Sequence, residues 1–300
     1  MDELQRSKVK SQLRQDVEDE FAQRSAEHRA RVNQTKAQRR YREAHGLEVT
    51  PVRLDFLAIG DSWFDYPVND LGVPWPNQDI VAQLQTIGNR APLILSRAIL
   101  GQAMTTVMNL PNQKHYVNDI ADSTQWIGGK PDAILVSGGG DDMVGDQFVI
   151  YLDYFGRGLS ARVQGVIGSI EASYQALFDF RDIHAPGTPI FCHCYDYAIP
   201  NGNGVLGQGP WLKPSLEFTS YGYPDGLTIV KDAIDGFYNM LNGLSGKKNN
   251  FILVDTRGTL TRDTSHPLGW ANEIHPYTAG FLALANKFIP ALRTVFPGRI

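Results

Sequence analysis

Short apolar runs alternate with longer amphipathic stretches from residue 53 to the end of the chain. The apolar runs have the length of buried strands and lie at residues 53–59, 92–96, 132–137, 188–195 and 250–254. Helical periodicity marks the stretches at about 78–87, 113–126, 162–182, 227–243 and 277–295. Buried strands joined by helices form a parallel sheet with helices on both faces. The pattern predicts an α/β fold, a three-layer α/β/α sandwich with a mostly parallel five-stranded sheet.

A serine directly follows the first apolar run, in the sequence Gly-Asp-Ser-Trp of residues 60–63. The carboxyl end of a parallel strand is where an open α/β sheet presents groups to a ligand. Two later segments offer partners for Ser62: the Gly-Gly-Gly-Asp-Asp of residues 138–142 and the Asn-Glu-Ile-His-Pro of residues 272–276. A hydroxyl needs such partners, because it is a weak nucleophile until a base activates it.

Together these segments resemble the motif blocks of the SGNH, or GDSL-type, serine hydrolases. That superfamily has GDS after the first strand, a glycine after the second, G-x-N-D after the third and D-x-x-H-P near the C-terminus. The corresponding places here are residues 60–63, 101, 139–142 and 272–276, and the resemblance spans residues 53–297. The α/β-hydrolase scaffold is disfavoured, because Trp63 and Phe64 follow Ser62 where its G-x-S-x-G nucleophile elbow needs a glycine.

The resemblance implies a role for each matched residue. Ser62 is the expected nucleophile and His275 the general base. The expected oxyanion donors are the backbone N–H groups of Ser62 and Gly101 and the side chain at position 141. Taken singly, Ser62 could instead cap a helix and His275 could be a surface residue. No cofactor is implied.

One departure from the family pattern is Asp141, which stands where the family has an asparagine. An ionised carboxylate accepts hydrogen bonds but cannot donate one to an oxyanion. Asp141 is therefore expected to be protonated, turned away or replaced by another donor. The neighbouring Asp142 favours protonation of one member of the pair, because close like charges resist double ionisation.

The second departure is Asn272, which stands where the family has the aspartate of the triad. Its amide oxygen can accept the Nδ1–H bond of His275 but adds no charge. Glu273 and Asp255 are candidate substitute acids. We favour Asn272 as the orienting residue and expect Glu273 to be a solvated acid at the start of the last helix.

Composition restricts the classes of partner. The chain has 300 residues, 42% of them hydrophobic, and a net charge of −4. Residues 1–45 carry 11 Lys and Arg against 8 Asp and Glu, and the rest carry 17 against 24. No nucleic-acid partner is expected, because a duplex binder needs a clustered basic footprint. The chain has no signal-like N-terminus and no apolar stretch near the ~18 residues of a membrane span, so a cytoplasmic location is expected, with signal-less export left open.

Two further groups of residues invite a metal or disulfide interpretation. Cys192 and Cys194 are two apart on an expected strand, so both point to one face and are expected to be buried thiols. Asp141, Asp142 and Asp146 lack the spacing of a calcium loop, and no metal site is predicted.

Residues 1–45 carry an apolar stripe at Val9, Leu13, Val17 and Phe21, which predicts one or two helices. We expect a charged helical segment over residues 1–50 and the hydrolase-like domain over residues 51–300. The segment either packs loosely on the domain as a solvated helix or docks a protein partner or a second copy. In both cases residues 1–45 are expected to be dispensable for chemistry.

The stretch at about 196–226 interrupts the alternation with many glycines, prolines and aromatic residues. A loop of this length is usually functional, and this one follows the fourth strand at the edge that carries Ser62. It is expected to cover the site, unless its aromatic residues only anchor it. The expected substrate pocket comprises Trp63, Phe64, Trp211 and Tyr221.

The sequence thus predicts a carboxylic ester hydrolase that acts through an acyl-enzyme on Ser62. Lipid esters, lysophospholipids and O-acetylated carbohydrates all remain as substrates, since the aromatic residues suit an acyl chain or a sugar face. The alternative is a weak or inactive scaffold of the same fold whose segment 1–45 docks a partner.

Overall fold

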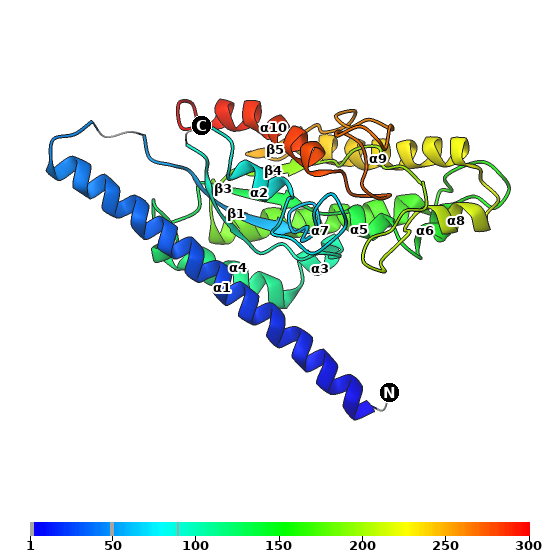
Figure 1. The fold of residues 1–300 in the computed structure, drawn as a ribbon, viewed down its shortest axis with the longest axis horizontal. Coiled ribbons are helices and arrows are strands. Elements are labelled where there is room, and N and C mark those ends of the chain that lie inside the picture. Colours follow the sequence, from blue (N-terminus) through cyan, green and yellow to red (C-terminus); the bar gives the residue numbers. More distant parts are fainter. Residues whose placement is uncertain (1–2, 49–50, 89) are drawn as a thin grey trace.

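The fold is seen in a computed structural model that describes residues 3–48, 51–88 and 90–300. Its sheet has five parallel strands in the order β2-β1-β3-β4-β5 (Figure 1). The strands are β1 (Asp55–Gly60), β2 (Leu93–Ser96), β3 (Ala133–Ser137), β4 (Ile190–His193) and β5 (Phe251–Val254). The α/β fold with a parallel five-stranded sheet is confirmed.

Helices cover both faces of the sheet. On one face α2 (Ile80–Leu84) packs against α10 (Thr278–Val295). On the other, α7 (Val163–His184) packs against α3 (Met104–Val107), α4 (Leu110–Ala121) and α9 (Tyr223–Ser245). The shorter helices are η1 (Ser123–Gln125), α5 (Gly140–Met143), α6 (Phe148–Tyr151) and α8 (Lys213–Phe218).

Two successive residues of β4 show the layering, because side chains alternate between the faces of a strand. The Sγ of Cys192 lies 3.1 Å from the hydroxyl of Tyr174 on α7. The ring of His193 lies 6.2 Å from that of Phe288 on α10. Cys192 and Cys194 are both free and buried, as expected.

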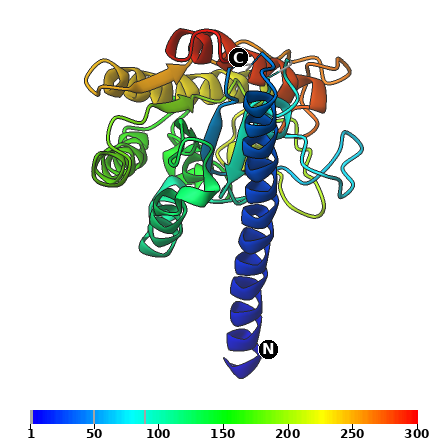
Figure 2. The same cartoon turned by 90° about the vertical axis from the view of Figure 1, so that its left-hand side faces the viewer.

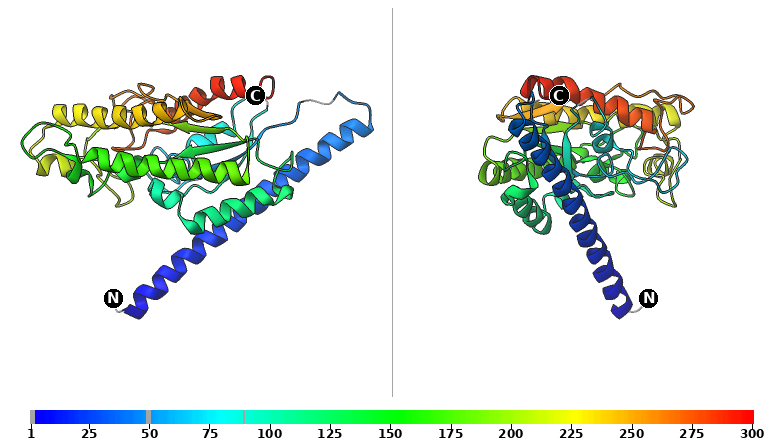
Figure 3. Two further views of the ribbon diagram at one scale, coloured as in Figure 1. Left: turned by 180° about the vertical axis from the view of Figure 1, so that it is seen from behind. Right: turned by 60° about the vertical axis from the view of Figure 1, so that its left-hand side comes forward.

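Residues 3–44 form one helix, α1 (Glu3–Ala44), which packs against the edge strand β2 and against η1. Phe21 and Val32 are buried in this contact. The N-terminal part of α1 extends beyond the body of the molecule (Figures 2 and 3). Of the predicted stripe, Phe21 packs on the domain and Val17 is half-buried. The side chains of Val9 and Leu13 lie outside the described ones.

The sheet order places one sequence motif at a special position. In a 2-1-3-4-5 sheet the connections leave β1 and β3 in opposite directions, and ligands bind in the crevice at the carboxyl ends of those two strands. Residues 60–63 follow β1 and residues 138–142 follow β3. The fold therefore brings the first and third motif blocks together.

None of the helices in the described ranges is long and apolar enough to cross a membrane.

Candidate active site

Ser62 lies in a tight turn at the carboxyl end of β1. The turn is closed by hydrogen bonds from Phe64 N to Asp61 O, 3.0 Å, and from Asp65 N to Ser62 O, 3.3 Å. Gly60 enters it with φ of +145°, and a Cβ there would lie 2.1 Å from the carbonyl oxygen of Ser137. Only glycine fits this close approach of two strands. Ser62 is buried, with 3% of its surface exposed.

Asp61 holds this turn to the neighbouring strands. Its Oδ1 accepts hydrogen bonds from Trp63 N, 3.0 Å, and from Ser137 Oγ, 2.6 Å. Its Oδ2 accepts one from the hydroxyl of Tyr195, which in turn accepts one from Gly140 N, 3.0 Å. Asp61 thus ties together the ends of β1, β3 and β4. Sequence reasoning missed this role, although Asp61 stands beside Ser62 in the GDS motif.

His275 reaches Ser62 from the loop before α10. Its Nε2 lies 2.7 Å from Ser62 Oγ. The ring stacks on Tyr66 with centroids 4.2 Å apart, and Trp211 meets it edge-on at 5.8 Å. Trp63 Nε1 donates to Ile274 O, 3.1 Å, which fixes the loop. Burial lowers the pKa of His275 to about 3, so the ring is neutral near pH 7 and can accept a proton.

Asn272 orients this histidine. Its Oδ1 lies 3.1 Å from His275 Nδ1 and also accepts bonds from the backbone N–H groups of His275, 2.9 Å, and Ile274, 3.1 Å. Its Nδ2 donates to the hydroxyl of Tyr66, 2.9 Å. The two backbone donors identify the atom that faces Nδ1 as the amide oxygen, which can only accept. This assigns the His275 proton to Nδ1 and leaves Nε2 free to accept the Ser62 proton.

The expectation of a solvated Glu273 is wrong. Glu273 is fully buried, and its carboxylate accepts four backbone N–H groups of the 196–226 insertion. These donors are Gly202 and Lys213, each at 3.0 Å, Leu212 at 2.6 Å, and Trp211. A carboxylate paired in this way anchors the insertion beside His275. It is not placed as a substitute acid, because its oxygens are taken and Nδ1 of His275 faces Asn272.

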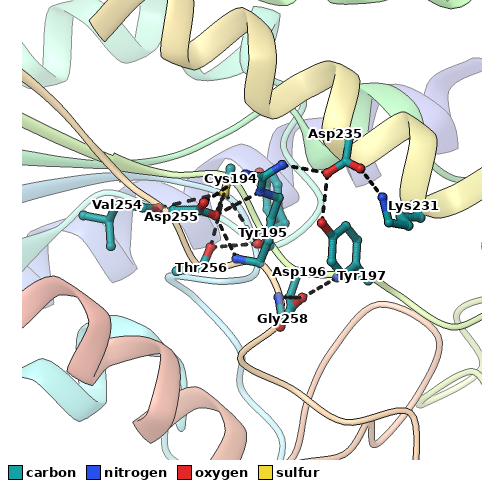
Figure 4. A network of polar contacts seen from close by, with 11 residues as sticks. Cys194, Tyr195, Asp196, Tyr197, Lys231, Asp235, Val254, Asp255, Thr256 and Gly258 are labelled. Carbon is teal, nitrogen blue, oxygen red and sulfur yellow. Dashed lines mark hydrogen bonds and ion pairs between the residues drawn. The ribbon is translucent and has the colours of Figure 1, made fainter.

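Asp255, the other candidate acid, is placed elsewhere. Its half-exposed carboxylate pairs with Arg257 at 2.9 Å and accepts a bond from Arg257 N, 3.1 Å. Figure 4 shows it in a polar network with the buried side chains of Cys194 and Thr256, next to the pairing of Asp235 with Lys231 and Tyr197. The structure gives Asp255 no hydrogen bond to His275, so its predicted role as a substitute acid is not supported.

A small cavity of about 50 Å³ opens beside Ser62. Its wall is mostly apolar, and the side chains that line it come from five segments of the chain: Trp63, Val144, Ala198, Ile234 and Ile274. Asp141 lines the same cavity.

The carboxyl of Asp141 has no hydrogen-bond partner within residues 3–48, 51–88 and 90–300. Burial raises its pKa well above the ordinary value, and the nearby carboxyls of Asp61 and Asp142 raise it further. Asp142 is occupied differently, since its Oδ2 accepts a bond from Met104 N, 2.6 Å. Of the outcomes expected for position 141, the geometry and charge favour a protonated carboxyl that faces the cavity.

Gly101 lies on the loop after β2, and two bonds hold that loop to the Ser62 turn. Ile99 N donates to Gly60 O, 2.9 Å, and Leu100 N donates to Asp65 Oδ2, 3.1 Å. Gly101 itself has φ of +79°, a conformation that favours glycine. Among the described residues, no acceptor is present for its N–H or for that of Ser62.

The predicted pocket residues divide into two pairs. Trp63 lines the cavity and Trp211 contacts His275. Phe64 is buried in the main core against His193 and Phe288, and it does not line the cavity. Tyr221 is buried in a second core cluster, where its hydroxyl donates to Asp153 O, 2.5 Å. The prediction of Phe64 and Tyr221 as pocket residues is therefore corrected, because both serve packing.

Two solved structures of similar fold put this arrangement in context. The lipase Lip_vut3 from goat rumen metagenome superimposes with a TM-score of 0.53 at 17% identity, over 82% of this chain and 99% of that one. The phospholipase A1 from Streptomyces albidoflavus NA297 gives 0.51 at 14% identity, over 81% and 99%. The chain has the fold of the GDSL-type, or SGNH, hydrolases. No protein-family model and no curated protein matches it.

The sheet and the helices that cover it lie within residues 55–295, whereas α1 packs against the β2 edge of the sheet. Within the described parts of the chain, no three His, Cys, Asp or Glu side chains are arranged to hold a metal ion.

Proposed function

We propose that this protein is a serine esterase that cleaves a short-chain carboxylic ester through an acyl-enzyme on Ser62. The observation that carries the proposal is the aligned chain of contacts from Ser62 Oγ to His275 Nε2, 2.7 Å, and from His275 Nδ1 to Asn272 Oδ1, 3.1 Å. A nucleophile, a base and an orienting group within hydrogen-bond reach are the arrangement that nucleophilic catalysis requires.

In the first half-reaction, Ser62 Oγ attacks the ester carbonyl carbon while its proton moves to His275 Nε2. The resulting imidazolium is held by Asn272 Oδ1 through Nδ1–H. Collapse of the tetrahedral intermediate breaks the bond to the alcohol oxygen, which takes the proton from Nε2 and leaves. Water then attacks the acyl-enzyme with the same base, and the carboxylic acid and free Ser62 are released.

The oxyanion of each intermediate needs donors that are already in place. The N–H groups of Ser62 and Gly101 supply two. The carboxyl of Asp141, kept protonated by burial and by Asp61, supplies the third as an O–H donor. A protonated Asp141 would donate a hydrogen bond to the oxyanion, as the asparagine amide of the family pattern does.

The cavity limits the acyl group. About 50 Å³ has room for a few water-sized groups only. Its apolar wall and small volume suit the methyl of an acetyl ester better than a long acyl chain. Among the classes left open by the sequence, an O-acetyl ester therefore fits better than a lipid ester.

The test is hydrolysis of 4-nitrophenyl acetate, butyrate and octanoate by wild type, Ser62→Ala, His275→Ala and the exposed control Ser169→Ala. We expect activity that falls with acyl length, and a loss in kcat of at least ~10⁴-fold for both site variants, because nucleophile and base act as a unit. Ser169→Ala should match wild type. An active, folded Ser62→Ala protein would exclude the mechanism, and an inert wild type would favour the scaffold alternative.

A further inference from the structure

Arg24 of the long helix α1 contacts two loops of the candidate active site. Arg24 donates from Nη2 to Asp65 Oδ1, 2.7 Å, and from Nη1 to Ala98 O, 2.9 Å. Its remaining partner is Glu20, one turn earlier in α1. Asp65 belongs to the Ser62 turn, and Ala98 belongs to the loop after β2 that carries Gly101. One guanidinium thus bridges the two segments that supply the nucleophile and an oxyanion donor.

Asp65 connects Arg24 to the loop that carries Gly101. Its Oδ2 accepts the N–H of Leu100, 3.1 Å, the residue directly before Gly101. Its backbone N–H bonds to Ser62 O, 3.3 Å. Its Oδ1 also accepts Asn77 Nδ2, 2.9 Å. The carboxylate therefore links the Ser62 turn to the N–H of Leu100, one peptide before the Gly101 N–H that is the proposed donor.

The pair of Arg24 and Asp65 is more than a solvated surface contact. The side chains are only 18% and 12% exposed. A charged partner stabilises a carboxylate at this depth, because taking an ion out of water is costly. Without Arg24, Asp65 would turn toward water, and its bond to Leu100 N would weaken.

The rest of α1 fixes where Arg24 stands. Arg97, which follows β2, donates to Phe21 O, 2.7 Å, and to Ser25 Oγ on either side of Arg24. One turn later, Arg29 pairs with Asp122 at 2.9 Å, far along the sequence from the Ser62 turn. The helix is thus held by contacts independent of Arg24, which leaves the Arg24 guanidinium available to hold the loops.

We propose that Arg24 is a positioning residue of the active site, which acts through Asp65 to set the Gly101 N–H against Ser62. This inference rests on the proposed esterase function. It reverses the expectation that residues 1–45 are dispensable for chemistry, since α1 then completes the oxyanion site from outside the sandwich.

The experiment compares Arg24→Gln with Arg29→Gln, a matched loss of an arginine that also ties α1 to the domain. On 4-nitrophenyl acetate, Arg24→Gln should lower kcat by about 10- to 100-fold with KM changed less than ~3-fold, because a misplaced oxyanion donor affects the transition state more than binding. Arg29→Gln should change kcat less than ~2-fold. Arg24→Lys keeps the charge but cannot donate to Asp65 and Ala98 in the same geometry, so its kcat should lie between those of wild type and Arg24→Gln.

Asp65→Asn provides a second route if Arg24→Gln folds poorly. Its kcat should fall like that of Arg24→Gln, and the double variant should be no slower than either single one, since both act on one link. Urea unfolding of each protein separates loss of stability from loss of rate.

A folded Arg24→Gln protein with wild-type kcat overturns the inference and leaves the esterase function standing, provided that Ser62→Ala is inactive. Equal losses in Arg24→Gln and Arg29→Gln also overturn it, because the effect is then only structural. If wild type is inert toward the esters and Ser62 does not react with a fluorophosphonate, the proposed function fails and this inference with it.

Discussion

The two sides of the Ser62 site use their polar groups in opposite ways. On the His275 side, Asn272 Oδ1 accepts three N–H groups and Glu273 accepts four. On the side of the proposed oxyanion donors, the N–H groups of Ser62 and Gly101 and the carboxyl of Asp141 have no hydrogen-bond partner among the described residues. The acceptors on the His275 side are fully hydrogen-bonded, whereas the donors on the other side have no protein partner.

The two sides therefore have different roles: one positions residues, and the other is available to bond a ligand. Polar groups in a folded protein are normally paired with protein or water, and one without a protein partner is free to bond a ligand. The paired side fixes the base and the insertion that flanks it. The unpaired side is where an incoming oxyanion would find its hydrogen bonds. Substitutions on the two sides should therefore change different measurements.

The largest effect is expected on the free energy of unfolding, for a substitution of Glu273 on the hydrogen-bonded side. Glu273→Gln replaces an acceptor-only carboxylate by an amide whose NH₂ faces backbone donors. The free energy of unfolding should fall by about 3 kcal/mol, because several charge-assisted bonds are lost at a buried site. Urea unfolding measures it, with Glu217→Gln as a control, since Glu217 lies exposed on the same insertion. A stability equal to that of the control would contradict the anchoring role.

The pH profile of activity should depend on one residue from each side, His275 and Asp141. Activity should be lost as pH falls through the pKa of His275, about 3, because the base becomes protonated. It should also be lost as pH rises through the raised pKa of Asp141, because the donor becomes an anion facing the oxyanion. Between these limits both groups are in the active form.

Asp141→Asn should abolish the alkaline loss of kcat/KM and leave the acid limb in place. Above the pKa of Asp141 the variant should exceed wild type by up to about 10²-fold, the value of one oxyanion donor. Below it, the two should agree within ~3-fold. An unchanged alkaline limb in the variant would mean that Asp141 does not face the oxyanion. A pH series from 3 to 10 on 4-nitrophenyl acetate decides between these results.

A smaller gain is expected from Asn272→Asp. The carboxylate would stabilise the imidazolium that forms during attack, so kcat should rise about tenfold near pH 8. The pKa of His275 should also rise, which moves the acid limb to higher pH. Stopped-flow kinetics with NMR titration of the ring measure both changes. Lower activity at all pH values would show that the amide is required to hold the loop.

Tyr66→Phe should have the smallest effect. It removes the hydroxyl that accepts from Asn272 Nδ2 but keeps the ring that stacks on His275. The kcat should fall only a few-fold, because the backbone N–H groups of Ile274 and His275 still orient the amide oxygen. Tyr66→Ala, which also removes the stacked ring, should fall further. Equal losses for the two variants would assign the whole effect to the hydroxyl.

Much of the fold could be predicted because its signals are local. The five apolar runs correspond to β1 to β5, and each predicted end lies within two residues of the observed one. Parallel strands are buried on both faces, so they appear in the sequence as consecutive apolar residues. The helix expected at 227–243 begins earlier, at Tyr223, where Pro224 occupies its first turn. The helix expected at about 78–87 is only Ile80–Leu84, capped by Asp79.

By itself the sequence determined the order of strands and helices and the positions of Ser62, His275 and Asn272 at strand and helix ends, because periodicity and end signals depend on neighbours along the chain. Only the tertiary structure decided the state of the acidic residues. Glu273 is paired and Asp141 unpaired because of the segments that fold around them, and Arg24 meets Asp65 across 41 positions. Burial and long-range pairing arise from packing, which brings together groups that no local pattern connects.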